Sequence, residues 1–217
     1  MQRLRASHSY GYVLGLVVVS FAFAAAAPDA DWSSGMLLLI ECATLVVALW
    51  TSGVAGTGSK FSLALIALSL AVAAALVVWG GKPLAGTAGL LSAALTFATV
   101  AAIVVGVLDQ NEVNRQVVAG AICIYVLLGF VFVYVYGALA VFGHGDLFAQ
   151  GTDGTRATRF YFSYVTLTTV GYGDYTMADN VGRALATLEG LLGPLYLVTV
   201  LALLVSRLRP KRFPAGG

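Results

Sequence analysis

Long apolar runs dominate this sequence and constrain its fold more than any other feature. Of the 217 residues, 59% are hydrophobic and only 10% are charged, whereas soluble domains usually carry about 25% charged residues. An apolar stretch of about 20 residues is long enough to cross a bilayer as an α-helix. The sequence therefore predicts an all-α membrane protein whose spans cover about 10–27, 36–50 (or 36–54), 61–79, 84–108, 117–142 and 180–208.

The polar linkers between these runs suggest two domains. The first four runs are joined by loops of a few residues, so each helix should lie antiparallel to the next. Residues 109–115 form the most polar linker in this part of the chain, and we place a domain boundary there. The prediction is a four-helix transmembrane domain over residues 1–110 and a second domain over residues 111–217.

The first run has an alternative interpretation. A basic start with Arg3 and Arg5, an apolar middle and the alanines before Pro28 also fit a cleaved signal peptide. Both interpretations leave the later topology unchanged.

A segment between the last two runs carries the most specific chemistry. Residues 158–168 are too short to span a membrane but suit a re-entrant half helix, with Thr155 or Thr158 as its N-cap. The next five residues, 169–173, read TVGYG. Glycine adopts left-handed dihedral angles without a Cβ clash, so such a segment can turn successive carbonyl oxygens toward one side. Carbonyl oxygens aimed at one axis can replace the water shell of a monovalent cation.

The TVGYG string, followed by an aspartate, resembles the selectivity filter of potassium channels. The resemblance covers about residues 117–209 strongly and the first half only in its number of helices. It implies a homotetramer with a central pathway and no cofactor other than the permeant K⁺. It also implies K⁺ sites at the carbonyls of Thr169, Val170, Gly171 and Tyr172, with Gly173 and Asp174 at the outer mouth.

Several side chains outside the string should support it. The half helix would aim the negative end of its dipole at the pathway, through Thr168. The aromatic side chains of the half helix should form a cuff that holds the filter at its diameter. Many members of the family have a glutamate where this chain has Val165, so Asp174 must find another partner or water. The expected support residues are Thr168, Asp174, Tyr161, Phe162, Tyr164 and Glu189.

Three residues of the last run need an explanation. Proline removes a helical hydrogen bond, so Gly193 and Pro194 form either a gating hinge or a static kink. Glu189 is a carboxylate within an apolar run, and such groups normally face protein or water. It can brace the filter, sense protons, or be a hydrogen-bonded carboxyl that packs on the half helix against Ser163 or Thr166.

The charge pattern predicts orientation and gating. If the amino terminus lies in the cytoplasm, six spans also place the carboxyl terminus there, and most Lys and Arg residues then lie inside. This is the positive-inside bias expected of a plasma-membrane protein. A voltage sensor needs regularly spaced arginines in its fourth helix, but residues 84–108 contain no Lys or Arg. We therefore expect no steep voltage dependence.

Other functional classes fit less well. A potassium uptake transporter would carry four filter-like loops in one chain, and a weakly selective cation channel would usually alter Tyr172. The sequence shows no nucleophile–base pair, metal cluster or phosphate loop that would indicate an enzyme. Its net charge of +2 is too small to suggest nucleic-acid binding. The expected partners are copies of this chain, lipid and K⁺, with no soluble partner evident. Cys42 and Cys123 lie in apolar runs and should be reduced. Whether His8 senses pH is not decided by the sequence.

Overall fold

The computed structural model describes residues 10–53, 57–110 and 114–207, and within them every regular element is an α-helix. The prediction of an all-α chain is confirmed for this part. Cys42 and Cys123 are buried and unpaired, as predicted. Arg3, Arg5, His8, Val54 and the basic segment from Leu208 lie outside the described residues. The helices are α1 (Tyr10–Ala26), α2 (Asp31–Ser52), α3 (Thr57–Val78), α4 (Lys82–Leu108), α5 (Arg115–Phe142), α6 (Arg156–Leu167) and α7 (Asn180–Arg207).

Five helices, α2 to α6, begin earlier than the sequence predicted. Helix α2 begins at Asp31, α5 at Arg115 and α6 at Arg156, and each of these first residues is charged. Polar groups fit a first turn because its free backbone amides need partners. At α5, the side chain of Asn114 accepts hydrogen bonds from the amides of Gln116 and Val117. Hydropathy finds the apolar middle of a helix and misses this polar first turn.

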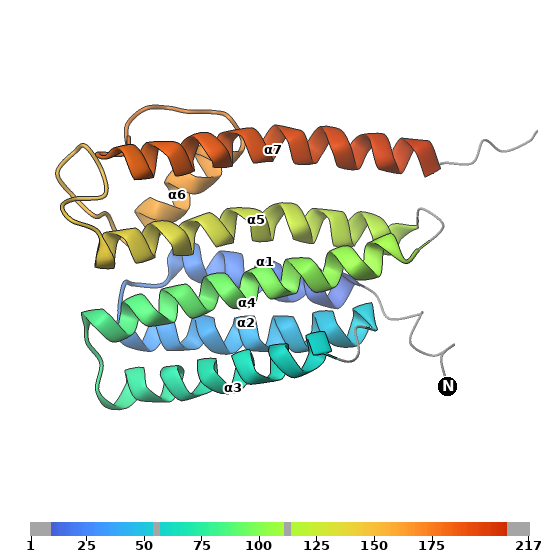
Figure 1. Cartoon of the computed structure of the whole chain (residues 1–217), viewed down its shortest axis with the longest axis horizontal. Helices are drawn as coiled ribbons and strands as arrows, with labels where there is room; N and C mark the ends of the chain where they lie inside the picture. Colours follow the sequence, from blue (N-terminus) through green and yellow to red (C-terminus); the bar gives the residue numbers. More distant parts are fainter. Residues whose placement is uncertain (1–9, 54–56, 111–113, 208–217) are drawn as a thin grey trace, which may run out of the picture.

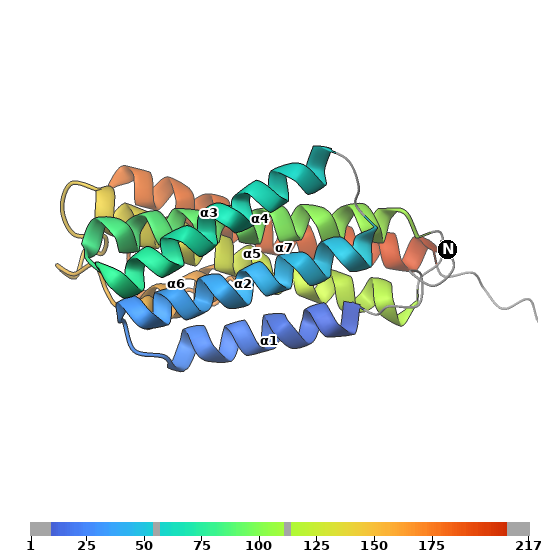
Figure 2. The ribbon, with the colours of Figure 1, turned by 90° about the horizontal axis from the view of Figure 1, so that it is seen from below.

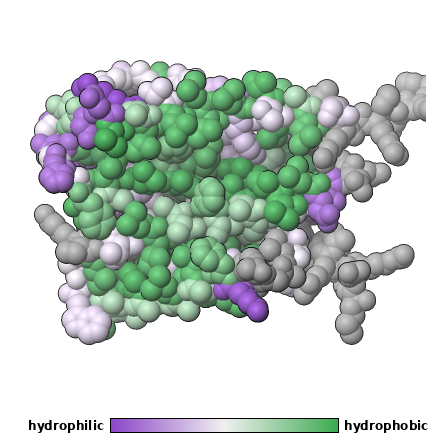
Figure 3. All heavy atoms as spheres, viewed as in Figure 1, coloured by the Kyte–Doolittle hydropathy of each residue, from purple (hydrophilic) through white to green (hydrophobic). Residues whose placement is uncertain are grey.

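Among the described residues, four helices are long and apolar enough to cross a membrane: Asp31–Ser52, Leu84–Leu108, Arg115–Phe142 and Asn180–Leu203. Two further apolar stretches, Tyr10–Ala26 and Lys60–Leu76, are shorter. The six predicted spans therefore all form helices, and four of them meet the length and composition expected of a full crossing. Apolar residues cover the middle of the face shown in Figure 3, with hydrophilic residues toward its ends.

The long helices lie side by side with alternating direction (Figures 1 and 2). Helix α4 packs against α2, α3 and α5, while α1 packs against α2, α5 and α6. The short α6 lies between α5 and α7 at one end of the bundle, and the segment that follows it returns to that same end (Figure 1). The beginning of α1 and the end of α7 lie at the opposite end. The first four helices thus form one side of the molecule, and α5–α7 form the other.

Helix α7 leaves much of its apolar surface uncovered. Only 11% of its spanning window is buried, compared with 61% for α5. The exposed side chains recur at helical spacing along one stripe, and Val198 is 69% exposed. Leu188, Leu191, Leu195, Val198 and Leu201 belong to this stripe.

Candidate functional site: the segment after helix α6

Helix α6 has a well-defined start. The Thr155 hydroxyl accepts a hydrogen bond from the Thr158 amide at 3.2 Å, and the Thr158 hydroxyl accepts one from the Thr155 amide at 3.3 Å. This reciprocal capping box satisfies two backbone donors at the helix start. Of the two threonines that the sequence offered, Thr155 is the N-cap. The cap fixes where α6 begins and therefore where the segment after it starts.

The backbone after α6 alternates in hand. Thr169, Gly171 and Gly173 have positive φ angles of 59°, 54° and 78°, while Val170 and Tyr172 between them do not. Thr169 is the one described residue other than glycine with a positive φ. A β-branched residue is strained in this region, and such strain gathers at functional sites. The alternation is the arrangement that the two glycines predicted.

The amides of this segment are turned back toward α6. The Thr169 amide donates to the Thr166 carbonyl at 2.9 Å, and the Val170 amide donates to the Val165 carbonyl at 2.9 Å. The Gly171 amide also donates to the Val165 carbonyl, at 3.3 Å. No hydrogen bond from a described residue ends on a backbone carbonyl of residues 168–173. The segment therefore presents free carbonyl oxygens, which can act as cation ligands.

The segment is open on the side away from α6. Every residue from Thr168 to Asp174 is exposed in the single chain, with Tyr172 at 70% and Val170 at 52%. The ring of Tyr161 in α6 stacks on that of Tyr172, with a centroid distance of 6.3 Å and an interplanar angle of 4°. Asp174 lies beside the Tyr161 side chain, which provides the partner that the apolar Val165 cannot.

Comparison with known proteins finds one similarity, and it includes this segment. Residues 120–209, which run from α5 through α6 and the TVGYG segment into the basic end of the chain, match the family model described as "Ion channel". This part of the chain is similar to ion-channel domains. No curated protein and no solved structure matches the chain.

Tyr161, Phe162 and Tyr164, which were expected to form a cuff, point in different directions from α6. Tyr161 faces the TVGYG segment, while Phe162 is buried against Tyr136 and Phe148. Tyr164 packs among aromatic side chains of α1 and α5, and its hydroxyl donates to the Val126 carbonyl at 2.7 Å. Of these three rings, Tyr161 is the one that stacks on a ring of the TVGYG segment.

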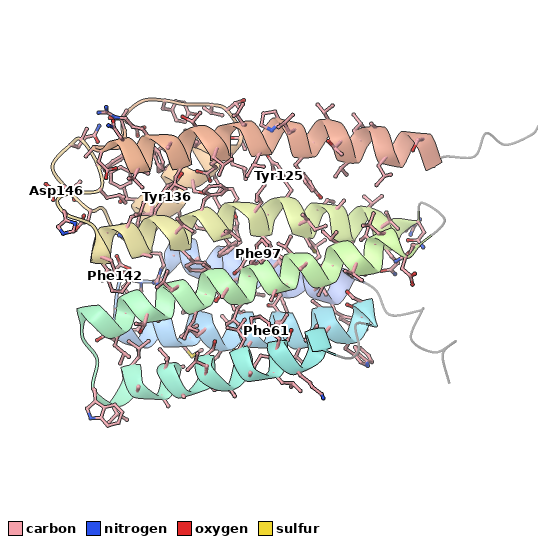
Figure 4. All side chains as sticks on the ribbon, in the orientation of Figure 1. Phe61, Phe97, Tyr125, Tyr136, Phe142 and Asp146 are labelled. Carbon is pink, nitrogen blue, oxygen red and sulfur yellow. The ribbon has the colours of Figure 1, made fainter. Side chains whose placement is uncertain are left out.

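Glu189 of α7 is fully buried behind α6. Its carboxylate accepts hydrogen bonds from the Tyr136 hydroxyl at 2.7 Å and the Ser163 hydroxyl at 2.5 Å. Ser163 also lies 3.0 Å from the Gly129 carbonyl. Tyr136 points from α5 toward α6 and α7 in Figure 4. The contact with Ser163 that the sequence suggested is present, and the Glu189 carboxyl connects α7 to both α5 and α6.

Gly193 lies where α7 comes closest to α6. A Cβ atom at this position would collide with the Leu167 carbonyl and lie 3.0 Å from its carbonyl carbon. Helix α7 continues through Gly193 and Pro194 to Arg207. The glycine therefore has a packing reason of its own, which sequence reasoning missed. A hinge at Gly193 and Pro194 stays a prediction.

The loop before α2 holds the start of α6. The carboxylate of Asp29 accepts a hydrogen bond from the Arg156 amide at 2.7 Å and lies 3.8 Å from the Arg159 guanidinium. The buried guanidinium of Arg156 donates to the Pro28 carbonyl at 2.8 Å and the Ser33 hydroxyl at 2.9 Å. A carboxylate at a helix N-terminus is favourable because it meets free amides and the positive end of the dipole.

Sequence reasoning gave neither Asp29 nor Arg156 a role. In the sequence, Asp29 lies in a short acidic loop after Pro28, and Glu41 lies near one end of an apolar run. The signal available for Glu41 was the one used for Glu189, a carboxylate surrounded by apolar residues. In the structure the Tyr134 hydroxyl of α5 donates to Glu41 of α2.

Proposed function

We propose that the protein is a potassium-selective ion channel built from four copies of this chain. It conducts K⁺ passively, without steep dependence on voltage. The observation that carries this proposal is the TVGYG segment, with its alternating φ angles, its amides bound back to α6 and its free carbonyl oxygens. Rings of such carbonyls replace the hydration shell of K⁺ in known filters. The carbonyls of Thr169, Val170, Gly171 and Tyr172 would be the K⁺ ligands.

Exposure supports assembly around an axis. One segment cannot surround an ion, and here it is open on the side away from α6. The uncovered apolar stripe of α7 lies on the same domain. An exposed apolar patch of this extent favours burial against lipid or another chain. Four copies with their TVGYG segments turned inward would complete the ion sites.

Orientation and gating follow from charge. The proposal places the shared end of α1 and α7 in the cytoplasm of a plasma membrane, and Asp174 outside. Moving one elementary charge across the membrane contributes about 2.3 kcal/mol per 100 mV, and α4 carries no Lys or Arg after its first residue. The first four helices therefore have no set of charges with which to drive opening.

Flux from proteoliposomes tests the proposal. Under a K⁺ gradient the protein should give a passive flux that greatly exceeds the Na⁺ flux under the same gradient. Tyr172→Ala should lower this preference, because it removes the side chain that stacks on Tyr161. Equal Na⁺ and K⁺ flux in the intact protein would refute selectivity, and steep sigmoidal opening in a voltage series would refute voltage independence.

A further inference from the structure

Helix α1 belongs to the first four helices, yet it packs directly on α6. In the described part of the chain, it is the one helix of these four whose backbone comes close to α6. The ring of Phe21 in α1 meets those of Phe160 and Tyr164 in α6, with centroid distances of 4.7 and 5.2 Å. Both are edge-to-face contacts, an arrangement that aromatic rings favour. Because Phe160 and Tyr164 are four positions apart, they lie on one face of α6, and Phe21 bridges two of its turns.

The loop after α1 holds the start of the same helix. The Asp29 carboxylate accepts a hydrogen bond from the Arg156 amide at 2.7 Å. The Ala27 and Pro28 carbonyls accept hydrogen bonds from the Arg156 guanidinium, at 3.3 and 2.8 Å. Arg156 is only 6% exposed, so these contacts lie largely out of water. Helix α6 is therefore held at its first residue by this loop and in its last turn by Phe21.

The last turn of α6 also holds the TVGYG segment. Val165 directly follows Tyr164 in this turn. Its carbonyl accepts hydrogen bonds from the Val170 amide at 2.9 Å and from the Gly171 amide at 3.3 Å. The ring that Phe21 contacts thus belongs to the residue next to this anchoring carbonyl. A sideways shift of α6 would move the carbonyl, and the segment would move with it.

Phe21 covers its side of α6 without being enclosed itself. It is 36% exposed, whereas Phe160 beside it is 6% exposed. The Tyr164 hydroxyl donates to the Val126 carbonyl, so α5 holds the tip of the Tyr164 side chain independently of α1. Truncation of Phe21 therefore removes the support from α1 and leaves the attachment to α5 in place. This makes Phe21 suitable for separating the position of α6 from the folding of the bundle.

We propose that α1 and the loop after it position α6, and that Phe21 is a positioning residue that raises selectivity for K⁺ over Na⁺. The inference rests on the proposed function, because it takes the carbonyls of the TVGYG segment as the selective ligands. Discrimination between K⁺ and Na⁺ depends on the size of a carbonyl cage or on the number and field strength of its ligands. The groups of such a site must be held within about 0.5 Å by the residues around them. The first four helices, whose α4 carries no Lys or Arg after its first residue, thus contribute to conduction by support rather than by sensing voltage.

Proteoliposome flux of full-length variants tests this role. A misplacement of about 1 Å at a functional site can cost about 100-fold, so Phe21→Ala should lower the ratio of K⁺ flux to Na⁺ flux at least about threefold. Phe21→Tyr keeps the ring and should keep the flux ratio of the unaltered protein. Phe23→Ala is the matched control, because it makes the same truncation on the same helix, where the Phe23 ring meets Trp32 of α2 at 6.3 Å. This control should also keep the flux ratio.

Hydrogen exchange gives a second measurement that does not depend on ion selectivity. The Val170 and Gly171 amides are both bonded to the Val165 carbonyl. They should exchange about fivefold faster in Phe21→Ala than in Phe23→Ala, because α6 loses two aromatic contacts with α1. If Phe21→Ala does not fold, Phe21→Leu and Phe23→Leu, which keep an apolar side chain, serve the same comparisons.

Two outcomes would overturn this inference. One is an unchanged flux ratio in Phe21→Ala when the intact protein is selective, which leaves the proposed function standing. The other is an equal fall of the flux ratio in Phe21→Ala and Phe23→Ala, which would show a general loosening of the bundle. Equal K⁺ and Na⁺ flux in the intact protein would instead refute the proposed function, and equal exchange in the two variants would then overturn the positioning role as well.

Discussion

Two glycines of α7 give the sharpest test of how α7 packs on α6. A Cβ at Gly193 would collide with the Leu167 carbonyl, whereas a Cβ at Gly190 would find its nearest atom, the Thr166 carbonyl oxygen, at 3.8 Å. Gly190→Ala should therefore stabilise the protein by about 0.5–1 kcal/mol, because alanine loses less backbone entropy in a helix. Gly193→Ala should destabilise it by about 1–3 kcal/mol, because α7 must move away from α6.

Denaturant unfolding of the purified protein measures both changes, and flux measures their effect on conduction. The residue before a proline also disfavours helical dihedral angles, so Pro194 can add to the effect of Gly193→Ala. The double variant Gly193→Ala with Pro194→Ala removes this contribution and should stay less stable than Pro194→Ala alone. If Gly193→Ala is as stable as Gly190→Ala and changes only gating, packing against Leu167 is not the reason for the glycine.

Two further predictions concern hydrogen bonds to Glu189 of α7 and to the first residue of α6. Tyr136→Phe leaves one oxygen of Glu189 without its donor and should lower the unfolding free energy by about 1–3 kcal/mol. Tyr125→Phe on the same helix is the control, because no hydrogen bond joins the Tyr125 hydroxyl to a described residue (Figure 4). Equal losses of unfolding free energy in the two variants would contradict a stabilising hydrogen bond between Tyr136 and Glu189. Asp29→Ala should weaken the start of α6 by about 0.5–2 kcal/mol, because it removes the acceptor of the Arg156 amide, and hydrogen exchange at that amide can detect the change. Unchanged exchange at that amide would show that the carboxylate is not its cap.

The helices of this protein could be predicted from sequence because hydropathy is a local property. A run of apolar residues predicts a helix whatever its neighbours are, and the glycines of TVGYG permit alternating dihedral angles by their own chemistry. The same reasoning placed the N-cap of α6 at Thr155 or Thr158 and suggested Ser163 as a partner of Glu189. It missed polar first turns such as that of α2, because those residues carry no apolar signal.

The sequence alone determined the all-α class, the order of the helices and the position of the segment with free carbonyls, since each depends on residues close together in the chain. Only the tertiary structure decided that Asp29 caps a helix 127 positions away, and that Tyr134 meets Glu41. It also decided that Gly193 makes room for Leu167. Such contacts depend on which faces of distant helices meet. That choice is set by packing and by pairing buried polar groups across the whole bundle, and no single stretch of sequence contains it.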